Sequence, residues 1–191
     1  LFLPGGFSNG DEPDGSGKFI AAFLRNPIAA DALMRLIDER DGLVLGVCNG
    51  FQALIKLGLV PYGRIVEPSA AMPTLTFNAI GRHQSRLVRT RVTSDRSPWL
   101  LLAGAENIYS MPVSHGEGRF LCEAELLRDL AQSGQIAAQC CADAPRPARS
   151  IGLADGQRDL ALAVDAAGDA VAGLHRAHAF WRAGVDQVAR L

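Results

Sequence analysis

One cysteine stands in a sequence context that could support nucleophilic catalysis. Cys48 is the central residue of Gly46-Val47-Cys48-Asn49-Gly50, between an apolar run and a helix-like segment. A G-x-nucleophile-x-G pattern is typical of a sharp strand-to-helix turn, which strains the backbone of the nucleophile and needs small residues two positions away. The helix that follows begins beside the sulfur, and its positive end favours the thiolate over the thiol. The pattern therefore predicts acyl transfer through a thioester at Cys48.

The same pattern also fits a buried structural cysteine between two packing glycines, but further features favour catalysis. The backbone N–H of Asn49 is placed to stabilise an oxyanion, and Gln52 follows Cys48 by one helical turn. The diglycine Gly5–Gly6 ends an earlier predicted strand, so a backbone N–H there could be the second oxyanion donor. In a parallel sheet both strand ends open at one edge, where α/β proteins bind their ligands.

The segments around Cys48 predict an α/β fold in which short buried strands alternate with helices. The apolar run 43–47 is typical of a strand covered on both faces, and residues 1–3 resemble the end of another buried strand. Because that strand opens the chain, we expect further sequence upstream of Leu1 in the complete protein. Helical periodicity and capping residues predict helices over 19–25, 29–40, 49–57 and 123–131.

The second part of the chain has a different pattern. Alternating apolar and polar residues predict a half-exposed strand over 87–93, and apolar runs predict strands over 108–113 and 136–140. Two apolar runs on either side of residues 165–169 predict a hairpin, and residues 179–191 predict a terminal helix.

The composition is that of a single globular domain, residues 1–191. The chain is 48% hydrophobic and 20% charged, which argues against disorder. Its formal net charge of −1 does not indicate nucleic acid or an anionic membrane as a partner, and no apolar run has the ~18 residues of a membrane helix. The four cysteines lack the spacing of a zinc site, and a chain of this length does not depend on disulfides, so we expect no metal and a cytoplasmic location.

The residues around Cys48 resemble the nucleophile motif of the class I glutamine amidotransferases. Other stretches are similar to one branch of that family, the glutaminase domain of phosphoribosylformylglycinamidine synthases, and most of all to its long single-chain form. The resemblance implies a flavodoxin-like α/β fold with a mostly parallel central sheet flanked by helices, here lacking its first strand or strands. It is carried by residues 5–19, 46–52, 76–86, 112–120 and 134–139.

The resemblance implies hydrolysis of L-glutamine, with ammonia passed through a channel to a synthetase region of the same longer chain. That region would use ATP and Mg²⁺ to convert formylglycinamide ribonucleotide to formylglycinamidine ribonucleotide in de novo purine biosynthesis. The glutaminase domain itself is expected to need no cofactor. Cys48 would attack the glutamine carboxamide. The residues that the resemblance assigns to oxyanion and substrate binding are Gly5, Gly6, Phe7, Asn49, Gln52, His115 and Glu117.

The family's general base is a His oriented by a Glu two residues later, and this pair is not intact here. His175 is the closest positional match, but the residue two positions later is Ala177. His178 is the other candidate, and Phe180 stands two positions beyond it. Without a carboxylate on Nδ1 the imidazole loses its fixed tautomer, which costs up to ~10⁴ in rate in serine enzymes. Cysteine depends less on the third member because its thiolate forms more readily.

Other interpretations remain beside an active glutaminase. His115 and Glu117 form a second His-x-Glu, but by resemblance this pair belongs to a different motif, and we expect it to line the pocket or to contact another domain. A catalytically impaired domain, retained for docking or regulation, is the main alternative. A different cysteine hydrolase of the same fold is a weaker one, because Gln52 and the stretch 81–86 argue against it.

Overall fold

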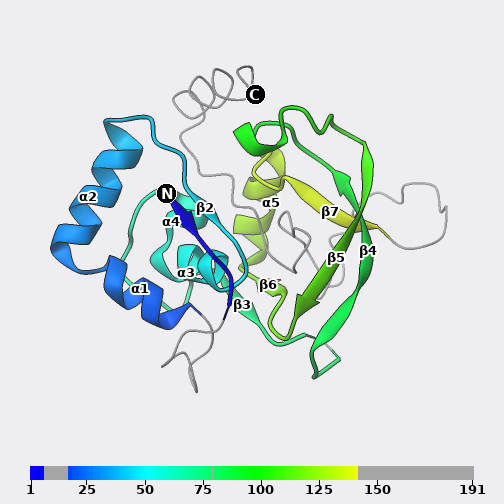
Figure 1. Cartoon of the computed structure of the whole chain (residues 1–191), viewed down its shortest axis with the longest axis horizontal. Coiled ribbons are helices and arrows are strands. Elements are labelled where there is room, and N and C mark those ends of the chain that lie inside the picture. The colour runs from blue at the N-terminus through cyan, green and yellow to red at the C-terminus, as the bar shows by residue number, and fades with distance from the viewer. Residues whose placement is uncertain (7–16, 79, 142–191) are drawn as a thin grey trace.

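The computed structural model describes residues 1–6, 17–78 and 80–141 (Figure 1). The predictions made for Phe7, for His175 and His178, and for the hairpin and terminal helix after residue 141 lie outside these ranges.

The N-terminal part builds the strand-to-helix unit that surrounds Cys48. β1 (Phe2–Leu3) pairs in parallel with β2 (Leu45–Gly46). Leu3 lies opposite Gly46, and the Val47 N–H donates a 2.9 Å hydrogen bond to the Leu3 carbonyl. The chain between these strands forms α1 (Lys18–Leu24) and α2 (Pro27–Asp38), and β2 leads into α3 (Asn49–Leu57).

Local sequence signals set the ends of these helices. The Asn26 side chain caps α2 by accepting a hydrogen bond from the Ile28 N–H, and Pro27 occupies the first turn, where no N–H is needed. α3 ends at Gly58, which has φ 82° and so takes the left-handed conformation that glycine allows. The predicted helices over 19–25, 29–40 and 49–57 are therefore confirmed. A short helix, α4 (Leu59–Tyr62), follows and was not predicted.

The remaining strands form two antiparallel sheets. β3 (Thr74–Thr76) pairs with β6 (Arg119–Leu121), and a three-stranded sheet has the order β5–β4–β7. Its strands, β4 (Gln84–Val92), β5 (Ile108–His115) and β7 (Ala138–Cys141), correspond to the three predicted strands in this region, whereas β3 and β6 were not predicted. A 3₁₀ turn (Pro98–Leu100) lies between β4 and β5, and α5 (Ala124–Gln132) confirms the predicted amphipathic helix.

In the described part of the chain, the expected parallel sheet is represented by one strand pair. Parallel pairing there is confined to β1 and β2. A parallel neighbour needs a crossover, usually a helix, and α1 and α2 supply one between these two strands. Residues 93–107 return the chain from β4 to β5 with a 3₁₀ turn instead, so the two strands run antiparallel.

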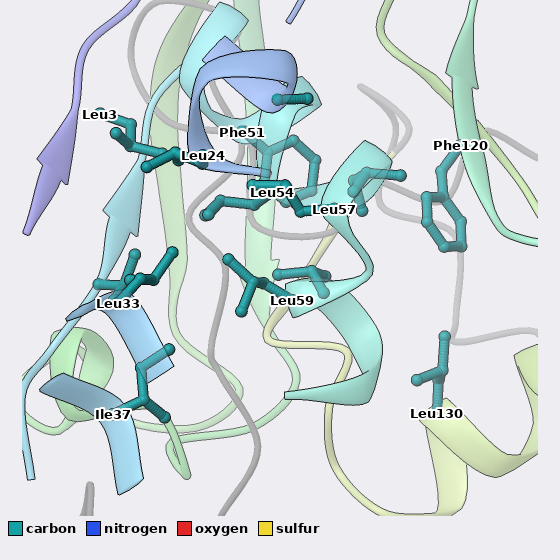
Figure 2. Close-up of a cluster of buried hydrophobic side chains, with 14 of the residues drawn as sticks. Leu3, Leu24, Leu33, Ile37, Phe51, Leu54, Leu57, Leu59, Phe120 and Leu130 are labelled. Carbon is teal, nitrogen blue, oxygen red and sulfur yellow. The ribbon is translucent and has the colours of Figure 1, made fainter. Parts of the chain in front are cut away.

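One apolar core joins the N-terminal part to α5 and β6. Figure 2 shows Leu54 and Leu57 of α3 among side chains of β1, α1 and α2, with Phe120 and Leu130 at the other end of the cluster. In Figure 1 the helices α1 and α2 lie on one side of the molecule and the sheet β5–β4–β7 on the other, with α5 and β6 between them. The core therefore fixes α3, the helix that begins at Cys48.

Some expectations about burial were wrong. Leu3 is buried, but Leu1 and Phe2 are 48% and 56% exposed, because β1 is the edge of a two-stranded sheet. Cys140 of β7 is exposed as well, so it is not a packing residue of the core. No helix in the described residues is long and apolar enough to cross a bilayer.

Candidate active site

Cys48 occupies a strained turn between β2 and α3. Its backbone has φ 50° and ψ −112°, and it stands at the N-cap of α3. A non-glycine residue rarely takes a positive φ, and such strain clusters at functional sites. The strand-to-helix turn predicted from the five-residue motif is therefore present. Asn49 is the first residue of α3, so its N–H is one of those that the helix itself leaves unbonded.

Glycines allow the segments of this turn to approach each other closely. A Cβ at Gly50 would lie 2.1 Å from the Leu3 carbonyl oxygen, and one at Gly46 would lie 2.9 Å from the Gly50 carbonyl carbon. Any side chain at these positions would push β1 and β2 away from α3. The two small residues of the motif are thus required by backbone packing on either side of Cys48.

The diglycine corner lies against the nucleophile candidate. A Cβ built on Gly5 would be 2.9 Å from the Cβ of Cys48. Gly6 has φ 115°, a conformation that side-chain-bearing residues rarely adopt. The structure therefore brings Gly5 and Cys48 together, as expected from parallel strands that end at the same edge of the sheet.

Gln52 links the cysteine helix to a distant turn. Its N–H donates to the Cys48 carbonyl at 3.0 Å, one helical turn back. Its side chain is buried, and Nε2 donates to both the backbone oxygen and the Oε2 of Glu117, each at 3.2 Å. The Gln52 Oε1 atom is buried and accepts no hydrogen bond from the described residues. Two residues assigned to substrate binding, Gln52 and Glu117, are thus in direct contact.

The turn after β5 is held by a residue that the sequence did not single out. Asn78 is buried, and its Oδ1 lies 2.9 Å from Nδ1 of His115 and 3.1 Å from the Gly118 nitrogen. Its Nδ2 donates to the carbonyls of Arg82 and His115, at 3.0 and 2.8 Å. Asn78 belongs to the stretch 76–86 of the resemblance, which was the one available signal.

Other candidates lie apart from this arrangement or outside the described ranges. The His83 ring pairs with the Ser114 hydroxyl at 2.9 Å on the exposed sheet surface. Phe7, His175 and His178 are among the residues whose structure is not described. Within the described ranges, no group of three His, Cys, Asp or Glu side chains is placed to hold a metal ion.

Comparison with known proteins identifies the class to which this fold and turn belong. Residues 1–154 match the family model of the CobB/CobQ-like glutamine amidotransferase domain, and the chain belongs to this family. A solved structure of PurLQS from Thermotoga maritima superposes with a TM-score of 0.54 at 26% identity, over 74% of this chain and 55% of that one. The class I glutamine amidotransferase α/β fold expected from the sequence is thereby confirmed.

Individual relatives carry a more specific name. The chain is 33% identical over 141 residues to phosphoribosylformylglycinamidine synthase subunit PurQ of Symbiobacterium thermophilum, which covers 74% of this chain and 53% of that protein. It is 36% identical over 137 residues to the subunit of the same name from Parasynechococcus marenigrum, covering 72% of this chain and 55% of the relative. The chain thus spans about half the length of the curated relatives it matches.

Proposed function

We propose that residues 1–191 form one glutaminase domain that hydrolyses L-glutamine through a thioester on Cys48. The observation that carries this proposal is the backbone of Cys48, an L-residue at φ 50° at the start of α3, with Gly5 against its Cβ. Strain of this kind is retained where the projecting side chain has a function. Membership of the glutamine amidotransferase family supports glutamine as the substrate.

The proposed reaction has two halves that balance as glutamine plus water giving glutamate plus ammonia. The Cys48 thiolate attacks the side-chain amide carbon, and the carbonyl oxygen becomes an oxyanion held by the N–H groups of Asn49 and of the Gly6 region. The C–N bond breaks as an imidazole, that of His175 or His178, protonates the leaving nitrogen. Water then attacks the thioester carbon, the imidazole takes its proton, and the C–S bond breaks to release glutamate and the thiolate.

Gln52, Glu117 and His115 are assigned to the substrate pocket in this proposal. The buried Gln52 Oε1 is the acceptor that bound glutamine would use, since the described residues leave it without a donor. The contact of Gln52 Nε2 with Glu117 keeps that amide oriented, with Nε2 towards Glu117 and Oε1 away from it.

The relatives' names suggest where the ammonia goes. The curated relatives are called PurQ subunits of phosphoribosylformylglycinamidine synthase, and the solved neighbour is called PurLQS. We propose that the ammonia is used in a synthetase region of the same longer chain, which it reaches through an ammonia channel. With ATP and Mg²⁺ that region would convert formylglycinamide ribonucleotide to the amidine in purine biosynthesis. The thiols of Cys48, Cys122 and Cys140 favour a reducing cytoplasm as the setting.

Release of glutamate from glutamine tests the central step. The purified chain should release glutamate, and a Cys48→Ala variant should lose this activity to the level of the buffer. A Cys140→Ala variant is the matched control, because Cys140 is an exposed thiol on β7, away from the β2–α3 turn, and its loss should leave the rate unchanged. Equal rates for the chain and the Cys48→Ala variant would end the proposal.

A catalytically impaired domain, retained for docking or regulation, is the second candidate. The observation that favours it is Ala177 in the position of the Glu that orients the family's general base. A glutamine analogue carrying an electrophile in place of the amide separates the two functions. Rapid modification confined to Cys48 supports the glutaminase, whereas modification of Cys48 no faster than Cys140 supports the impaired domain.

A further inference from the structure

Asn78 joins two segments that carry the candidate site. It follows β3, and its own N–H donates to the Gly116 carbonyl at 2.9 Å. Its side-chain oxygen and nitrogen together reach both His115 and Gly118. One buried asparagine is therefore hydrogen-bonded to three of the four residues of the turn 115–118.

The fourth residue of this turn is Glu117, which is the one that faces Gln52. Glu117 meets Gln52 in two hydrogen bonds, and its neighbours His115, Gly116 and Gly118 are hydrogen-bonded to Asn78. Gln52 in turn lies one helical turn from Cys48 on α3. A continuous chain of contacts thus runs from Asn78 to the helix of the nucleophile.

The hydrogen bonds also fix the chemistry of the His115 ring. The Asn78 amide nitrogen donates to two backbone carbonyls, so Oδ1 is the atom that faces the ring. Because that oxygen only accepts, Nδ1 of His115 must carry the proton. The ring is thereby held with its Nδ1 towards Asn78.

We infer that Asn78 is a positioning residue of the glutaminase site, acting on bound glutamine through Glu117 and Gln52. This inference rests on the proposed function. Asn78 itself contacts neither Cys48 nor its helix in any described hydrogen bond; its effect passes through the turn.

Asn78→Asp is the most informative variant. It preserves the shape of the side chain and replaces the amide donor by an oxygen that faces two carbonyls. Displacing the turn should lower kcat/KM for glutamine by about tenfold, mostly through KM. The rate of Cys48 alkylation by iodoacetamide, which needs no glutamine recognition, should change by less than about twofold. Asn107→Asp is the matched control, since that exposed amide donates to Ala103 in a distant loop, and it should leave both rates unchanged.

A double variant separates positioning from general damage. If Asn78 acts through Glu117, Asn78→Asp combined with Glu117→Gln should be no slower than the slower single variant. Full additivity of the two effects, or a wild-type kcat/KM for Asn78→Asp, would overturn the inference. If Asn78→Asp does not fold, Asn78→Ser keeps one hydroxyl donor and takes its place in the same comparison.

A spectroscopic measurement decides the inference even if the wild-type chain releases no glutamate, which would refute the proposed function instead. The side-chain NH₂ signals of Gln52 in a ¹⁵N spectrum report its contact with Glu117. Asn78→Asp should displace these signals as Glu117→Gln does, while Asn107→Asp should not. Unmoved Gln52 signals in the Asn78 variant would refute the positioning role regardless of activity.

Discussion

At Cys48 the backbone holds an L-residue at φ 50° and ψ −112°. Such a conformation costs about 1–3 kcal/mol, which the packing around it must offset. Gly46 and Gly50 let the backbones of β1, β2 and α3 approach one another closely around this residue. The strain and the two glycines are thus parts of one arrangement.

This strain predicts that two substitutions of Cys48 differ in their effect on stability. Cys48→Gly removes the penalty for a positive φ, whereas Cys48→Ala keeps it. The glycine variant should therefore have a free energy of unfolding about 1 kcal/mol higher than the alanine variant, although glycine also raises the entropy of the unfolded chain. Urea denaturation of both variants measures this difference. A less stable glycine variant would show that the turn is not strained.

The thiols should differ in reactivity with pH. Burial, and to a smaller extent the negative charge of Glu123, raises the pKa of the Cys122 thiol. A raised pKa leaves less thiolate near pH 7, so Cys122 should be alkylated more slowly there than Cys140, which is exposed. Iodoacetamide labelling followed by mass spectrometry at several pH values checks this. The Cys122 rate should keep rising as the pH is raised, and equal rates at pH 7 would contradict the prediction.

Among the elements, the turn between β5 and β6 offers a matched pair of glycines. A Cβ at Gly118 would lie 2.2 Å from Cε1 of His115, whose ring is tied to Asn78, whereas a Cβ at Gly116 meets nothing within 4 Å. Gly118→Ala should lower the free energy of unfolding by about 1–3 kcal/mol, and Gly116→Ala should change it by less than about 0.5 kcal/mol. Urea denaturation compares the two; similar values would show that the ring moves aside freely.

The elements that sequence patterns predicted are those whose signals are local. α2 has its cap and its proline at adjacent positions, Asn26 and Pro27, and α3 ends at a glycine, so both could be found without knowing their neighbours. β3 and β6 are three residues long and pair Thr74 with Leu121, so no short window of sequence contains both partners. The mostly parallel sheet was inferred from the family, and the described strands support it at β1 and β2 alone.

The candidate site likewise has one part that the local sequence predicts and one part that it does not. The Cys48 turn and its glycines lie within five consecutive residues, so the motif could be recognised from the sequence. The contact of Gln52 with Glu117 joins residues 65 positions apart, and Asn78 reaches His115 over 37 positions. These contacts depend on how β3, β5 and α3 meet, which periodicity and propensity do not encode.

At the scale of the whole molecule, the buried apolar side chains of the described residues are distributed unevenly. The main core contains Leu54 of α3 together with Phe120 of β6 and Leu130 of α5. In the sheet β5–β4–β7, Val88 and Val113 form a small buried cluster of their own. The helices and β6 should therefore unfold as one cooperative unit. β4 and β5 should unfold locally at a lower free energy.

Hydrogen exchange of two truncation variants tests this division. Leu54 is fully buried, so Leu54→Ala should cost about 2–5 kcal/mol and lower amide protection in α1, α3 and α5 alike, because the three helices share one core. Val88→Ala, the matched change in the small cluster, should lower protection in β4 and β5 and leave α3 unchanged. Unaltered protection of α5 in the Leu54 variant would mean that α5 and α3 unfold independently, and that the turn bearing Glu117 is not held against α3 by a shared core.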